Sequence, residues 1–241
     1  MKPPKFLKNI KIYTVAEKTK IAVISIVSLA FSWLLLLVFE RALWQLGAYF
    51  SGFSGVIGWH GVSFYGSAET WNRKQVLALY LMPLFVLVIL FLSLSFRKKL
   101  LFNKSNFYYL FISWFYTLLL VRVFFMPVVE IIHKSGVYYA LLWMGFSRIE
   151  QWMAAAIAVV FYVVNLFRVS ELFSQGLFIT SKEPVKPGEI LLQLVYIWGF
   201  PVIFFLPVSL AGFESRYFLL GIIVTILINL PVISNYKVIV K

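Results

Sequence analysis

Long apolar runs, each broken off by a short polar segment, dominate the pattern of the chain. Six of these runs approach the about 20 residues that a helix needs to cross about 30 Å of hydrocarbon. They cover residues 21–39, 76–96, 107 to about 126, about 151 to 167, 190 to about 210 and 217 to about 233. Lipid tolerates only a backbone whose hydrogen bonds are satisfied internally. The pattern therefore predicts an all-α integral membrane protein with about six transmembrane helices.

A seventh apolar stretch, residues 137–146, is too short to cross the hydrocarbon layer. Two interpretations suit it. It forms the outer part of a bent helical hairpin, or it is a short re-entrant or interfacial segment packed against protein.

Basic residues between the runs predict the orientation, because translocation of Lys and Arg is disfavoured. Fifteen of the 22 lie on one side of the predicted membrane: Lys2, Lys5, Lys8, Lys11, Lys18, Lys20, Arg97, Lys98, Lys99, Lys104, Arg168, Lys182, Lys186, Lys237 and Lys241. Six lie on the other: Arg41, Arg73, Lys74, Lys134, Arg148 and Arg216. Both termini are thus expected in the cytoplasm, and Arg122 falls within the third run.

This topology predicts the domain organisation. Residues 1–20 form a basic amphipathic segment on the cytoplasmic leaflet, and residues 21–241 form a single membrane domain. Residues 40–75 make an outward loop and residues 168–189 a cytoplasmic loop. We expect the chain in a bacterial cytoplasmic membrane, where it crosses several times.

The composition agrees with a membrane protein and indicates which class of partner the basic residues bind. Charged residues are 13% of the chain, against roughly 25% in an ordinary soluble domain. The net charge of +13 alone would suit nucleic acid, but the basic residues flank apolar runs. They indicate anionic lipid headgroups on the cytoplasmic side instead, and no nucleic acid is expected as a partner.

Arg122 is the most informative polar residue, because a charge inside a span costs several kcal/mol unless it is paired or reaches the interface. If the helix continues past Pro127, then Glu130 and His133 share a face, and Arg122 projects in a similar direction. Glu150, at the start of the fourth run, could approach them. One interpretation is a pocket that binds an anion, relays protons or holds a partner. The other is interfacial snorkelling with one structural ion pair.

The outward loop concentrates aromatic and charged side chains. Its main candidates for a binding surface are Glu40, Arg41, Trp44, Trp59, His60 and Trp71. Trp and Tyr favour the level of the headgroups, so an aromatic belt is one interpretation. The other is a surface for a lipid, a glycan or a partner protein, since aromatics and Arg dominate binding hot spots.

Catalytic patterns in the chain are incomplete. There is no Cys and no Asp, and the two histidines lie far apart in sequence, so no metal site or cofactor is predicted. Gly52-Phe53-Ser54-Gly55 matches the G-x-S-G pattern that rhomboid intramembrane proteases use for their serine. In that family the motif begins a buried helix and a later span supplies the histidine. Here it lies in the outward loop, His60 is too close in sequence, and His133 lies at a loop.

These observations rank three functions. First is a non-catalytic accessory, anchoring or assembly subunit with a membrane protein as partner. Second is a permease or carrier for a small or lipidic solute that uses the region of Arg122. Third is an intramembrane hydrolase.

Overall fold

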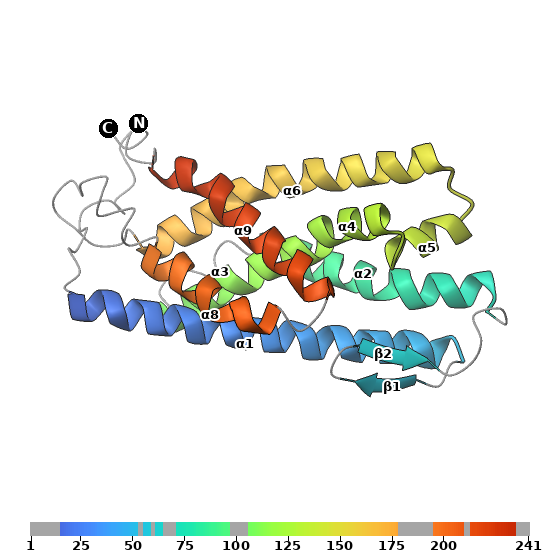
Figure 1. Cartoon of the computed structure of the whole chain (residues 1–241), viewed down its shortest axis with the longest axis horizontal. Helices are drawn as coiled ribbons and strands as arrows, with labels where there is room; N and C mark the ends of the chain where they lie inside the picture. The colour runs from blue at the N-terminus through green and yellow to red at the C-terminus, as the bar shows by residue number, and fades with distance from the viewer. Residues whose placement is uncertain are drawn as a thin grey trace. The chain divides into compact units, whose positions relative to one another are not determined.

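The computed structural model describes residues 15–52, 55–58, 61–64, 71–96, 106–177, 195–209 and 213–234. Its helical elements in chain order are α1 (Val15–Phe50), α2 (Arg73–Phe96), α3 (Asn106–Leu120), η4 (Val121–Phe125), α4 (Met126–His133), α5 (Val137–Trp143), α6 (Arg148–Leu177), η5 (Val195–Gly199), α8 (Phe200–Ser209) and α9 (Phe213–Ser234) (Figure 1). Two short strands, β1 (Gly55–Gly58) and β2 (Gly61–Phe64), follow α1.

Within the described part of the chain, four helical stretches are long and apolar enough to cross a membrane. They are Thr19–Phe50, Arg73–Ser95, Phe107–His133 and Arg148–Val169. The coarse prediction of a helical, membrane-embedded protein is confirmed to this extent. Two further apolar stretches, Val195–Phe204 and Arg216–Asn229, lie where the fifth and sixth spans are predicted, and both are shorter.

The first helix is longer than its apolar run. The helix α1 has 36 residues in all and continues beyond residue 39 to Phe50. Glu40, Arg41 and Trp44 are therefore helical residues. After it, β1 and β2 pair as an antiparallel hairpin in which Gly55 faces Phe64 and Gly58 faces Gly61. The pattern of apolar runs did not predict this hairpin, although its Val and Ile residues favour extended backbone.

Packing divides the chain into two units. One contains residues 1–32, 99–117 and 163–241, and the other contains residues 33–98 and 118–162. We call them the first unit and the second unit. The predicted domain bounds, 1–20 and 21–241, stay a prediction.

Buried serines and aromatics hold the first unit together. Ser25, Ser28 and Ser32 follow one face of α1 and are fully buried. The hydroxyl of Ser25 donates to the carbonyl of Ile197 at 2.7 Å and accepts from the indole N–H of Trp114 at 2.8 Å. Small side chains let helices approach closely in lipid, and such bonds satisfy polar groups there.

Prolines explain the two π-helical stretches. Pro127 follows η4 and Pro201 follows η5, and a proline supplies no N–H to the helical ladder. In η4 the ladder widens, so that the N–H of Met126 donates to the carbonyl of Val121, five residues back. The helix thus continues through Pro127 to His133, which places Arg122 and Glu130 on connected helical segments.

The second unit packs α5 against α2 and α4. Ile131 of α4, Leu141 of α5 and Ala155 of α6 form a small buried apolar cluster. The rings of Tyr80 on α2 and Tyr139 on α5 lie 6.4 Å apart. The seven-residue α5 is therefore held by protein on several sides, and it is too short to cross a membrane.

Candidate functional site: a charged cluster within the second unit

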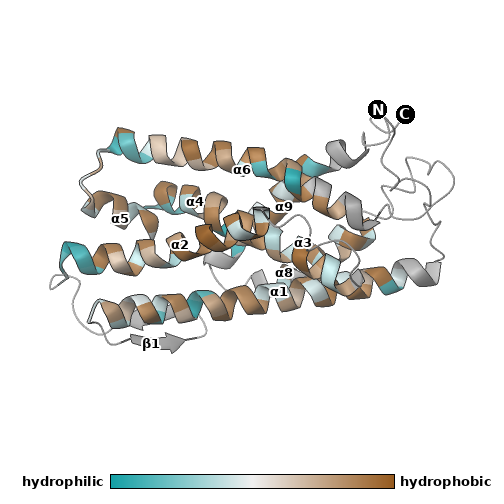
Figure 2. Ribbon diagram, turned by 180° about the vertical axis from the view of Figure 1, so that it is seen from behind, coloured by the Kyte–Doolittle hydropathy of each residue, from teal (hydrophilic) through white to brown (hydrophobic). Residues whose placement is uncertain are grey.

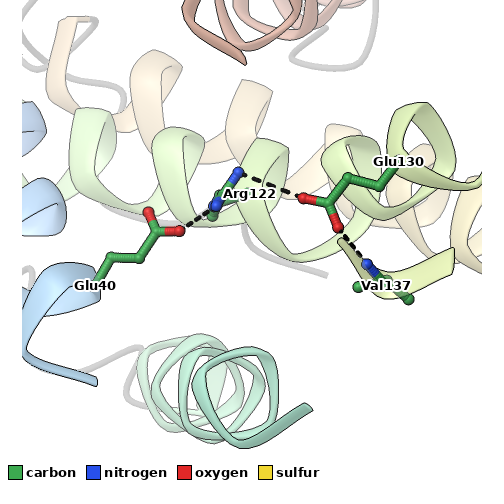
Figure 3. Close-up of polar contacts among 4 residues, drawn as sticks. All are labelled: Glu40, Arg122, Glu130 and Val137. Carbon is green, nitrogen blue, oxygen red and sulfur yellow. Dashed lines mark hydrogen bonds and ion pairs between the residues drawn. The ribbon is translucent and has the colours of Figure 1, made fainter. Parts of the chain in front are cut away.

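The site is centred on Arg122, which lies in the π-helical segment η4. Its side chain is 13% exposed, so most of it is enclosed by protein. A guanidinium in this setting needs acidic partners, because it keeps its charge and carries five N–H donors. Two carboxylates supply them, one from each side (Figure 3).

Glu40 of α1 is the first partner. Its Oε1 forms an ion pair and a hydrogen bond with Nη2 of Arg122, and its side chain is 16% exposed. The pair connects α1 to η4, elements that lie 82 residues apart in sequence. Charge-assisted bonds of this type are stronger than neutral ones, and removal of Arg122 would leave the Glu40 carboxylate without its cation.

Glu130 of α4 is the second partner, and it bonds in two directions. Its Oε1 lies 3.8 Å from Nη1 of Arg122, while its Oε2 accepts a hydrogen bond from the backbone N–H of Val137 at 2.8 Å. Val137 is the first residue of α5, whose N-cap residue, Gly136, offers no side-chain bond. The carboxylate of Glu130 therefore takes the place of a capping side chain.

A tight turn brings α5 back to Glu130. Lys134 ends α4 in the left-handed conformation with φ 55°, and the N–H of Ser135 donates to the carbonyl of Glu130 at 2.9 Å. Gly136 follows with φ 48°, and a Cβ at this position would overlap the Glu130 carboxylate. Glycine is required here both by the backbone angle and by the close approach of the acid.

A small cavity lies beside the charged groups. Its volume is about 30 Å³. The lining residues are Glu40, Trp44, Tyr80, Pro83, Leu84, Leu87, Arg122, Pro127, Glu130 and Val137. This volume holds about one water molecule and is far below the about 300 Å³ at which pockets for organic ligands begin.

The other predicted members of the cluster lie elsewhere in the second unit. His133 is the exposed last residue of α4. Glu150 is exposed, and its carboxylate accepts a hydrogen bond from the backbone N–H of Ser147 at 2.6 Å, while the Ser147 hydroxyl faces the N–H of Glu150 at 3.4 Å. This reciprocal arrangement is a capping box at the start of α6. Glu150 thus stabilises its own helix.

The structure also places part of the predicted aromatic surface. Trp44 lines the cavity, and its ring meets Tyr80 edge-on at 5.5 Å. Arg41 lies on α1 beside Glu40, and Trp71 precedes the start of α2. Ser54, Trp59 and His60 lie outside the described residues.

The start of α2 carries a second reciprocal cap. The N–H of Asn72 donates to the side chain of Gln75 at 2.9 Å, and the N–H of Gln75 donates to the side chain of Asn72 at 3.0 Å. Gln75 also donates to the carbonyl of Ser51 at 2.8 Å. This contact connects the end of α1 to the start of α2.

The sequence pattern predicts that Arg122 lies near Glu130 and Glu150, and it places Glu40 in the outward loop. A signal for the Glu40 pair was available. Under the predicted topology, Glu40 lies at the outer end of the first span and Arg122 near the outer end of the third. A search for opposite charges at the same predicted depth in the membrane would have predicted the ion pair between Glu40 and Arg122.

Among the residues that the structure describes, no group of three or more His, Cys, Asp or Glu could hold a metal ion. No family model, no curated protein and no solved structure matches the chain.

Proposed function

We propose that the chain is a non-catalytic membrane subunit that anchors or assembles a larger membrane protein complex. The observation that supports this proposal is that the charged groups of the cluster pair with one another. Arg122 is paired with Glu40 and Glu130, and Glu130 also caps α5. These contacts connect α1, η4, α4 and α5 to one another. The cavity of about 30 Å³ beside them suits a water molecule better than a carried solute.

The proposal includes a topology of six spans with both termini in the cytoplasm of a bacterial cell. The two shorter apolar helical stretches, Val195–Phe204 and Arg216–Asn229, would complete the six. Since the chain has no cysteine, single introduced cysteines can be labelled in intact cells without background. An impermeant maleimide should label Ser67→Cys, in the outward loop, and should not label Ser105→Cys or Lys241→Cys until the membrane is opened. Labelling of either of the latter in sealed cells would overturn the topology.

The function is tested by extracting the tagged chain from its own host in mild detergent and identifying what co-purifies. A membrane protein at fixed stoichiometry is the expected result, and deletion of that partner should lower the abundance of the chain. A chain that emerges alone and monodisperse would contradict the proposal. The carrier alternative would then predict a solute-induced thermal shift that Arg122→Ala or Glu130→Gln abolishes.

A further inference from the structure

Exposed basic side chains gather at the end of the second unit where α2 and α6 begin. Arg73 and Lys74 open α2, Arg148 opens α6, and all three are exposed. The guanidinium of Arg73 donates to the carbonyl of Met144 at 3.0 Å, directly after α5. Met144 and Arg148 are four residues apart, so this bond brings the starts of the two helices to the same region. Both starts are hydrophilic in Figure 2, whereas the helices beyond them are largely hydrophobic.

Aromatic and aliphatic side chains adjoin these cations. Trp143 at the end of α5 is 39% exposed, and Trp152, one helical turn after Arg148, is 48% exposed. Ile149 and Met153 are exposed on the same stretch of α6. The amphipathic indole ring favours the level of lipid headgroups, with charge on one side and hydrocarbon on the other.

We propose that this end of the second unit, defined by Arg73, Lys74, Trp143, Arg148 and Trp152, binds the phosphate groups of anionic phospholipids. Guanidinium groups bind phosphate with two parallel bonds, and an ammonium adds a point charge. Glu150, the acid in the first turn of α6, is held in the helix cap by a hydrogen bond from the backbone N–H of Ser147. A lipid fits better than an acidic protein, because the exposed surface passes from cations through Trp to aliphatic residues, the order of layers in a leaflet.

The proposal is tested on the full chain reconstituted in vesicles that contain a photo-crosslinkable phosphatidylglycerol or a matched phosphatidylcholine. Cross-linked peptides are mapped by mass spectrometry. We expect the peptide from residues 137–160 to cross-link several-fold more to phosphatidylglycerol. In Lys74→Gln/Arg148→Gln the yield with phosphatidylglycerol should fall several-fold, toward the yield with phosphatidylcholine, since each basic residue near an anionic surface contributes to lipid attraction. That variant retains Arg73 and its bond to Met144.

The matched control is Lys20→Gln/Arg216→Gln, which removes the same charge from exposed positions in the first unit. Its cross-linking at residues 137–160 should stay unchanged. An equal loss in the control, or equal yields from the two lipids, would overturn the proposal. If the test variant does not fold, a competition experiment with the unaltered chain provides the test. Excess unlabelled phosphatidylglycerol should suppress cross-linking of residues 137–160 by the photo-crosslinkable phosphatidylglycerol, and excess phosphatidylcholine should not. Suppression by both would also overturn it. The outcome of this experiment does not depend on whether a protein partner co-purifies with the chain.

Discussion

The Oε2 atom of Glu130 accepts a hydrogen bond from the backbone N–H of Val137 at 2.8 Å, across the turn that joins α4 to α5. The other oxygen of the same carboxylate faces Arg122 at 3.8 Å. One side chain therefore stabilises a helix start and a buried cation together. The two contributions are separable, because an amide can accept the hydrogen bond but cannot pair with the charge.

Glu130→Gln and Glu130→Ala should differ in stability. The glutamine retains an acceptor for Val137 and loses the charge, whereas the alanine loses both and leaves a helix N–H unsatisfied. We expect Glu130→Ala to cost about 1–3 kcal/mol more of unfolding free energy than a change that keeps the acceptor. Unfolding in mild detergent, followed by circular dichroism, measures the difference. Equal stability of the two variants would show that the bond to Val137 contributes nothing.

Gly136→Ala should destabilise the second unit more than Gly145→Ala does. Both glycines have positive φ, 48° and 87°, which residues with a Cβ rarely adopt, so a Cβ strains the backbone by about 1–3 kcal/mol at each position. Only at Gly136 would the new Cβ also overlap the Glu130 carboxylate, since nothing lies within 4 Å of a Cβ at Gly145. Thermal unfolding compares the two. Glu130→Ala should lessen the additional cost of Gly136→Ala, and strict additivity of the pair would refute the overlap.

The sequence predicted the helical, apolar character well because hydrophobicity along a span is a local property. The limits of α1 were not predictable in the same way. Hydropathy ends with the apolar run near residue 39, but the helix continues to Phe50 because its hydrogen bonds do not depend on apolar side chains. Glu40 was therefore assigned to a loop although it is a helical residue.

The charged cluster was predictable only in part. Arg122 and Glu130 lie eight residues apart, and helical periodicity predicts that they approach each other. The ion pair with Glu40 joins residues 82 positions apart, and the bond from Val137 depends on a turn with two positive φ angles. Glu150 carries the S-x-x-E spacing of a capping box with Ser147, a local signal that competed with the hypothesis of a shared pocket.

Arg122 and Glu40 should be energetically coupled. Arg122→Ala leaves two carboxylates without their cation, and we expect a loss of about 3 kcal/mol or more in unfolding free energy. Glu40→Gln alone should cost less, and the double variant should be less destabilised than the sum of the two by about 0.5–3 kcal/mol. Chemical unfolding of the four proteins completes the cycle. A coupling energy near zero would show that the ion pair does not stabilise the contact between α1 and η4.

Ser147→Ala should test whether Glu150 serves the start of α6 rather than the charged cluster. The substitution removes the hydroxyl that faces the N–H of Glu150, and loss of an N-cap costs about 0.5–2 kcal/mol. Glu150→Gln preserves an acceptor for the Ser147 N–H and should perturb the helix less than Glu150→Ala. Hydrogen exchange of the first turn of α6 is the sensitive measurement, because fraying raises exchange there while the amides around Arg122 stay protected. If Glu150→Ala instead increased exchange in η4 and left the start of α6 unchanged, the carboxylate would belong to the cluster, and its role as a helix cap would be wrong.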